Sequence, residues 1–318
     1  MKHIQWIPLV LLLALAQERL PAAETINAAA GMAFTSSQDA GSARSIALGS
    51  SAVGIAEGSD ALAWNPAGLA GLCTAEAALN HNSTLVGSFR DNLVLGLPLD
   101  RAGGLGLSVN YADNGVFEGR DEAGHLTSDY SARAFGASAG WGFQAPEDLS
   151  FGLAVKVNRE DLADDSFYDL AGDLGVLWSP TPSLRLGAAY NNLGLDVAGA
   201  HLEQGVSLGI SSYFWKGSDV EWLAALSGES LTHGDSSVHV GLETTLFHML
   251  SLRGGYSADV DNPQAADGLL GWTLGGGVHL AGFSVDYAFV PMEELGNVQR
   301  LSLTYAFGAC PTAPGKRS

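Results

Sequence analysis

Residues 298–307 read Val298-Gln-Arg-Leu-Ser-Leu-Thr-Tyr-Ala-Phe307, with an apolar side chain at every second position of the second half. Alternate side chains of a β-strand lie on one face, which here carries Leu301, Leu303, Tyr305 and Phe307. An apolar face that ends in an aromatic residue is typical of the last strand of a transmembrane β-barrel. We expect barrel-assembly machinery to recognise Leu303, Tyr305 and Phe307, although Gly308 to Ser318 follow them.

The start of the chain has the features of a secretory signal. Lys2 and His3 precede an apolar run over residues 4–16, which is shorter than the roughly 20 residues that a membrane-spanning helix needs. Small residues at 14–16 and 20–23 each offer a cleavage site. We therefore predict that residues 1–23 are a removed signal peptide.

The composition favours many short strands over helices. Hydrophobic residues make up 47% of the chain and charged residues 15%, yet no later stretch is long and apolar enough for a membrane helix. The 41 glycines suit turns, bulges and close strand packing. Without residues 1–23 the chain has 33 acidic and 13 basic residues, a net charge of −20, which argues against nucleic acid as a partner.

From Thr74 onward the sequence repeats one unit, an alternating segment of about ten residues followed by a turn or loop. This length suits a tilted strand that crosses a bilayer. The periodicity predicts an all-β fold, an antiparallel transmembrane barrel of about 14 strands. The expected strands cover residues 74–81, 90–97, 103–111, 130–144, 149–158, 168–178, 183–191, 204–214, 219–228, 237–246, 249–257, 269–280, 282–290 and 298–307.

The connections between these strands alternate in length. Those expected to be short are 98–102, 145–148, 179–182, 215–218, 247–248 and 281. Those expected to be long are 112–129, 159–167, 192–203, 229–236, 258–268 and 291–297. Outer-membrane barrels have short periplasmic turns and long extracellular loops. We therefore expect this protein to lie in the bacterial outer membrane, with both of its termini in the periplasm.

Alternation also predicts which charged side chains face the barrel interior. Charges in membrane strands are tolerated when they face a polar interior and pair across strands. The interpretations are a luminal path or gate, or a structural ladder that fills the barrel. The predicted ladder comprises Lys156, Asp173, Arg185, Glu243, Arg253, His279, Asp286 and Arg300.

Aromatic residues gather near the ends of the expected strands. Such rings favour membrane interfaces, so they predict two aromatic girdles, the alternative being ordinary aromatic residues of strands. The residues concerned are Trp141, Phe143, Trp178, Tyr190, Phe214, Trp215, Tyr256 and Trp272.

Residues 24–72 do not alternate and are rich in Ala, Gly and Ser. They contain Ser42-Ala-Arg-Ser-Ile-Ala-Leu-Gly49 and Ser59-Asp-Ala-Leu-Ala-Trp-Asn-Pro-Ala-Gly-Leu-Ala70. This piece resembles the N-terminal signature of the FadL-like (OmpP1/FadL/TodX-type) barrels, and specifically of the PorV/PorQ family. Further stretches that carry the resemblance are 173–187 with 192–194, 252–256, and 283–291 with 295–296.

The resemblance implies a fourteen-stranded outer-membrane barrel whose N-terminal segment folds into the lumen as a plug or hatch. Its plug residues would be Arg44, Asp60, Trp64, Asn65, Pro66, Ala67 and Gly68. Barrel size gives an independent reason for a plug, since about 8 strands enclose a filled interior and about 16 an open channel. The alternative is that residues 24–72 form a flexible periplasmic leader.

Cys73 directly precedes the first expected strand and Cys310 closely follows the last. These two strands pair in a closed barrel, which places both thiols at the periplasmic rim of the seam. In an oxidising compartment we predict a disulfide across the closure, the alternative being two unpaired thiols.

The sequence gives no enzymatic constellation. It contains no HExxH pattern and no metal-ligand spacing of His with Cys, and no catalytic residue, metal ligand or cofactor is predicted. Two acidic stretches, Glu160–Asp165 and Asp259–Asn262, are interpreted either as calcium ligands or as solvated loop charge, and neither forms an EF-hand pattern.

These observations divide the chain into a signal peptide (1–23), a plug segment (24–72), a transmembrane barrel (73–310) and a short tail (311–318). The resemblance implies passive uptake of hydrophobic compounds, such as long-chain fatty acids, across the outer membrane. Its alternative is a docking component of type IX protein secretion, and a purely structural barrel is a third interpretation. The expected partners are membrane lipid and a hydrophobic ligand or secreted protein cargo.

Overall fold

The computed structural model describes residues 41–83, 88–119, 125–163, 165–195, 203–232, 234–261, 271–292, 297–308 and 310. The expected signal peptide, residues 24–40 of the expected plug segment and the tail at 311–318 lie outside these residues. No helix within the described ranges has the length and apolarity needed to cross a membrane.

Most of the described chain forms strands of one sheet. The strands are β1 (Glu76–Ser83), β2 (Phe89–Pro98), β3 (Gly104–Phe117), β4 (Tyr130–Ala145), β5 (Leu149–Leu162), β6 (Asp165–Thr181), β7 (Leu184–Leu195), β8 (Gly205–Lys216), β9 (Val220–Leu231), β10 (Ser236–Leu246), β11 (Leu250–Asp259), β12 (Trp272–Leu280), β13 (Phe283–Pro291) and β14 (Asn297–Ala306). A 3₁₀ turn, η5 (Asp100–Ala102), links β2 to β3.

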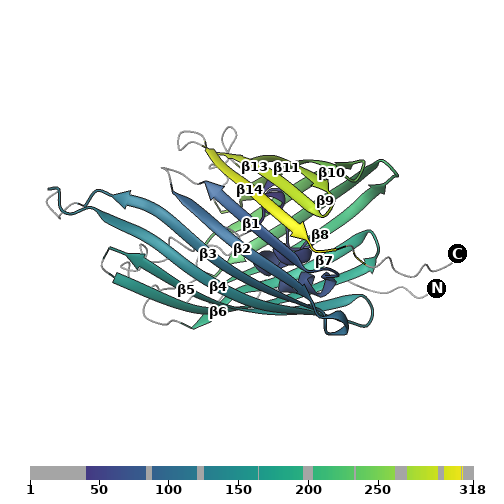
Figure 1. Ribbon diagram of the computed structural model, residues 1–318, viewed down its shortest axis with the longest axis horizontal. Helices are drawn as coiled ribbons and strands as arrows, with labels where there is room; N and C mark the ends of the chain where they lie inside the picture. Colours follow the sequence, from purple (N-terminus) through teal and green to yellow (C-terminus); the bar gives the residue numbers. More distant parts are fainter. Residues whose placement is uncertain are drawn as a thin grey trace.

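The sheet closes on itself, because β1 pairs with both β2 and β14. Every neighbouring pair is antiparallel, and strands follow one another around the barrel in chain order (Figure 1). The predicted fourteen-stranded antiparallel barrel is confirmed. Closure leaves no unpaired sheet edge, which is the condition that a β-structure must meet to span lipid.

The two faces of the wall differ in polarity. Leu79 of β1 lies opposite Leu303 of β14, and these outward side chains are 48% and 43% exposed. One residue further along, Asn80 lies opposite Ser302, and these inward side chains are 7% and 1% exposed. An apolar outer surface with a polar interior is the arrangement of a transmembrane barrel.

The strands extend beyond the residues that alternate in polarity. β3 continues to Phe117 with a register shift after Asp113, and β5 and β6 continue to Leu162 and from Asp165. The long connection predicted over residues 159–167 is therefore wrong, since most of it is strand. Hydrogen-bonded pairing continues there although the alternation of apolar residues has ended. The strand lengths predicted from polarity alone were therefore too short.

A disulfide joins Cys73 and Cys310 at the seam, with 5.2 Å between their Cα atoms. Cys73 lies just before β1, and Cys310 lies just after β14. Nearby, the backbone nitrogen of Phe307 donates to the carbonyl of Ala75 and extends the pairing of these strands. The covalent link therefore closes a loop of 237 residues where the first and last strands meet.

The seam disulfide makes a testable contribution to stability. We expect C310S to lower the free energy of unfolding by about 2 to 4 kcal/mol, because the bond limits the unfolded chain. Urea unfolding of the refolded protein in detergent measures this change. Native protein treated with a maleimide but no reductant should carry no label, and labelling of both thiols would contradict the disulfide.

Candidate functional site

Residues 41–72, here called the interior segment, lie inside the barrel. They form α1 (Ala43–Ala47), η2 (Gly58–Asp60), α2 (Ala61–Trp64) and η3 (Pro66–Gly71). Figure 1 shows these short helices in purple, surrounded by strands and close to the end of the barrel that carries the short turns. Leu48, Trp64 and Leu69 are at most 2% exposed, and they belong to the main hydrophobic cluster, which apolar residues of the segment form together with residues of the wall.

The first part of the interior segment, residues 43–54, follows one half of the wall. The backbone nitrogen of Ala43 donates to Ser302 Oγ of β14 at 2.7 Å. The backbone nitrogen of Gly49 donates to Thr273 Oγ1 of β12 at 3.0 Å. Further along, Ser211 Oγ of β8 donates to the carbonyl of Gly54 at 3.0 Å. We call residues 43–54 the first pass.

The second part, residues 65–72, follows the other half of the wall and is called the second pass. Asn65 fixes its start and is fully buried. Its side-chain nitrogen lies 3.2 Å from the carbonyl oxygen of Val53, 3.1 Å from that of Val176 and 3.4 Å from that of Ala188. Its Oδ1 accepts from the backbone nitrogen of Ala67, so one amide caps η3 and ties both passes to β6 and β7.

Glycines on the inner wall allow the interior segment to approach this closely. A Cβ on Gly255 would lie 2.0 Å from the nitrogen of Gly49, and a Cβ on Gly152 would lie 2.1 Å from the carbonyl carbon of Pro66. Both distances are far below van der Waals contact, so any side chain there would push the segment away. Glycines in this position are Gly104, Gly142, Gly152, Gly175, Gly187, Gly209, Gly241, Gly255 and Gly275.

Asp60 stabilises the start of α1. Its carboxylate accepts from the backbone nitrogen and hydroxyl of Ser42, at 2.7 and 2.9 Å, and also from the hydroxyl of Ser45. Burial raises the pKa of Asp60, although the hydrogen bonds from Ser45 and Ser42 act in the opposite direction. The resemblance implied that Asp60 belongs to the plug, and the structure shows it bound to Ser42, the N-cap residue of α1, which lies 18 residues earlier in the chain.

Arg44 of α1 connects the interior segment to the wall electrostatically. Its Nε and Nη2 donate to the two oxygens of Glu243 on β10, both at 2.9 Å. Its Nη1 donates to Glu57 Oε1 at 2.6 Å, and Glu57 Oε2 accepts from Arg185 of β7 at 3.1 Å. Burial raises the pKa of Glu57, but Arg44 and Arg185 outweigh this effect and lower it.

The ion pairs continue along the wall beyond Glu243. Arg253 of β11 binds Glu243 through Nε and Asp286 of β13 through Nη1. Three guanidinium groups and three carboxylates thus form one chain of ion pairs across the barrel, here called the ion network: Arg185, Glu57, Arg44, Glu243, Arg253 and Asp286.

A cavity of about 470 Å³ lies beside the first pass and the ion network. Its lining mixes carboxylates, guanidinium groups and hydroxyls, among them Glu76, Tyr213 and His279. The side chains of Arg44 and Glu57 keep 23% and 42% of their surface open. The cavity therefore combines charged groups with apolar ones such as Ile55 and Ala56, and it borders Arg44, the only basic residue within residues 41–72.

The predicted charge ladder separates into parts in the structure. Arg185, Glu243, Arg253 and Asp286 belong to the ion network, and His279 bonds to Ser284 beside it. Lys156 pairs instead with Asp173 at 2.6 Å on β5 and β6, and Arg300 Nη1 lies 3.5 Å from the carbonyl of Gly41. Sequence reasoning missed Glu57, which has no strand periodicity to mark its direction.

The residues nominated as plug all lie inside the barrel, although they play different parts there. Arg44 binds carboxylates, Asp60 holds the N-cap residue Ser42, and Asn65 ties the backbone to the wall. Pro66 and Ala67 lie against glycines of the wall, whereas Trp64 lies against Gly41 of the segment itself. A Cβ on Gly68 would lie 2.4 Å from the carbonyl of Ala56, so this position also needs glycine.

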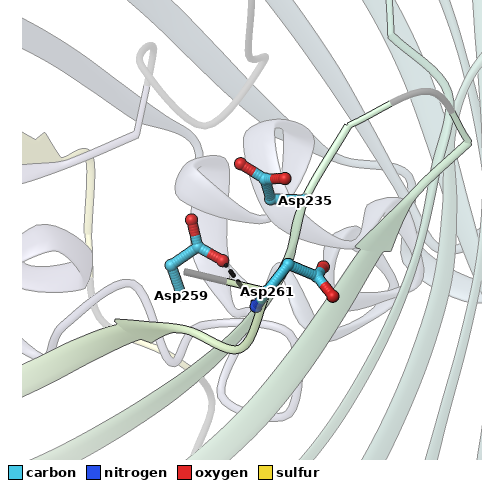
Figure 2. Close-up of side chains that lie close together, drawn as sticks. All are labelled: Asp235, Asp259 and Asp261. Carbon is cyan, nitrogen blue, oxygen red and sulfur yellow. Dashed lines mark hydrogen bonds between the residues drawn. The ribbon is translucent and has the colours of Figure 1, made fainter. Parts of the chain in front are cut away.

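Three aspartates meet at the ends of β9, β10 and β11, away from the interior segment. Oxygens of Asp235, Asp259 and Asp261 all lie within 4.8 Å of one another (Figure 2). Asp259, foremost, and Asp261 raise the pKa of Asp235 by repulsion. The sequence had singled out Asp259 and Asp261 as loop charge or calcium ligands, and the structure adds Asp235 from another connection. These carboxylates could share one cation.

The fold and interior segment together define a class of protein, a transmembrane barrel with a segment folded across its lumen. Among solved structures, the chain resembles a TodX monoaromatic hydrocarbon channel mutant, with 15% identity, a TM-score of 0.60, and coverage of 85% of this chain and 99% of that one.

Two more structures show the same fold. The Ralstonia pickettii toluene transporter TbuX has 13% identity and a TM-score of 0.58, over 83% of this chain and 97% of that chain. A Pseudomonas aeruginosa FadL homologue has 14% identity and a TM-score of 0.57, over 86% and 98%. The sequence matches no protein-family model and no curated protein. The similarity therefore shows that this chain has the fold of these three barrels, of which one is described as a channel and one as a transporter.

Two adjacent glycines of β11 test the contact between wall and interior segment. We expect G255A to displace the first pass, at a cost of about 1 to 3 kcal/mol, because the added methyl group would overlap the backbone of Gly49. Faster hydrogen exchange of amides 45–54 would report the displacement. In the control G254A, the nearest atom to the new Cβ is 3.8 Å away, and exchange should not change. Equal exchange in both variants would contradict the contact.

Proposed function

We propose that this chain is a passive channel of the bacterial outer membrane for hydrophobic small molecules, closed at rest by its interior segment. The observation that carries the proposal is the pair of passes that follow both halves of the wall inside a closed barrel. An open porin has no need of such a segment, whereas a channel that opens on demand does. The TodX and TbuX structures, named for hydrocarbons and toluene, support the class of substrate.

The orientation follows from the connections. Short turns lie at the end of the barrel near the interior segment, and longer connections lie at the other end. Since outer-membrane barrels place their short turns in the periplasm, the segment closes the periplasmic half. A solute would enter from outside and reach the periplasm when the first pass moves. Passive movement down a gradient needs no nucleotide or metal.

Uptake by whole cells tests this function. We expect bacteria that lack their own hydrophobic channels to accumulate labelled toluene or oleate several-fold faster when they express this chain. A labelled disaccharide serves as the control probe and should enter at the rate seen with an empty vector. If expression of this chain changed the uptake rates of toluene, oleate and the disaccharide by the same factor relative to the empty vector, the result would contradict the function.

The resemblance of Asn65 to Leu69 to PorV-type proteins suggests the other outcome of this experiment. If neither apolar probe enters, and exported proteins bind the purified barrel, docking in type IX secretion would replace uptake as the function. The long connections on the outer side would then be the binding surface.

A further inference from the structure

We propose that Arg44 is the latch that keeps the first pass against the wall, and that the first pass is the part of the interior segment that moves. This inference deepens the proposed function, because it names the residue that holds the channel closed. Arg44 acts here as a positioning residue, since it touches the wall rather than a transported solute.

The two passes differ in how their ends are held. Both passes pack against wall glycines, and the amide of Asn65 bonds to the wall and to Val53 of the first pass. Only the second pass is continuous with Cys73 of the seam disulfide, so it is anchored covalently within one residue of its end. The described residues show no such link at the start of the first pass. Apart from the contacts of Arg44, its polar contacts to the wall are hydrogen bonds between its backbone and the side chains of Ser302, Thr273, His239 and Ser211.

Arg44 makes the strongest of these contacts. Its guanidinium group binds Glu243 with two hydrogen bonds and Glu57 with a third, so it links the segment to β10 and, through Arg185, to β7. Paired bonds of this geometry are roughly twice as strong as neutral hydrogen bonds. The described interior segment contains no second basic residue that could replace it.

The surroundings give the first pass room to move. The 470 Å³ cavity is lined by Ser42, Arg44 and Ser45 on one side and by Glu243, Arg253 and Asp286 on the other. It therefore borders the latch itself. When Arg44 leaves, Glu243 keeps Arg253 and Glu57 keeps Arg185 as partners, so no carboxylate of the pair is left without a cation. We therefore expect the barrel wall to stay folded when Arg44 moves away.

Single-channel recording of the full-length protein in planar lipid bilayers tests the latch. We expect R44Q to raise the open fraction by roughly tenfold or more, because it removes the charge-assisted hydrogen bonds of Arg44 to Glu243 and Glu57. R44K keeps the charge but cannot bind Glu243 with a planar pair of donors, so its open fraction should lie between those of wild type and R44Q.

The matched control is K156Q, which removes another buried ion pair of the wall. Lys156 binds Asp173 and Asn192, and none of its recorded contacts reaches the interior segment. We expect the open fraction of K156Q to equal that of wild type. An equal rise in K156Q and R44Q would show general loosening of the barrel and overturn the proposal, as would an unchanged R44Q.

Hydrogen exchange locates the moving part. In R44Q, amides 45–54 should exchange faster while amides 67–72 stay protected, and the reverse order would overturn the assignment of the moving pass. Ion current requires no particular solute, so the outcome does not depend on the substrate. A latch that opens to ions while toluene uptake stays absent would disprove the proposed function and leave the latch standing.

Discussion

Pairing between β1 and β14 is the interaction on which the rest of the structure depends. A sheet in lipid must pair every backbone group, and an open edge would leave a row of donors and acceptors without water. Closure solves this problem and fixes the register of all fourteen strands, since each strand follows its neighbour in chain order. The disulfide of Cys73 and Cys310 sits at this one seam, where no hairpin connects the paired strands.

Closure creates a second constraint, because a barrel of this size leaves an interior that its own side chains do not fill. The interior segment fills it by following the wall, which explains why glycine recurs at inward positions of nine strands. At Gly152 and Gly255 the wall backbone and the segment backbone approach one another where a Cβ would stand. The contact between segment and wall therefore accounts for at least nine of the 41 glycines.

The strands were predictable because a membrane wall imposes one simple pattern, polar inside and apolar outside, on every strand. The prediction failed where that constraint ends, as at residues 159–167, because strands outside the bilayer no longer need an apolar face. The interior segment has no period at all. Arg44 and Asn65 could be predicted as plug residues only from the family resemblance. Neither the resemblance nor residue spacing gave a reason to choose Glu57. Its partnership with Arg44 and Arg185 joins residues distant in sequence and depends on the folded path of the chain.

The ion network also bears on how a hydrophobic solute would pass in the proposed channel. An apolar molecule that entered the cavity beside Arg44 would displace water from carboxylates and guanidinium groups and give them nothing in return, which is costly. Movement of residues 43–54 would instead carry Arg44 away, while Glu243 would keep Arg253 and Glu57 would keep Arg185 as partners. Under the proposed function, the position of the first pass, rather than the width of the barrel, would therefore control passage.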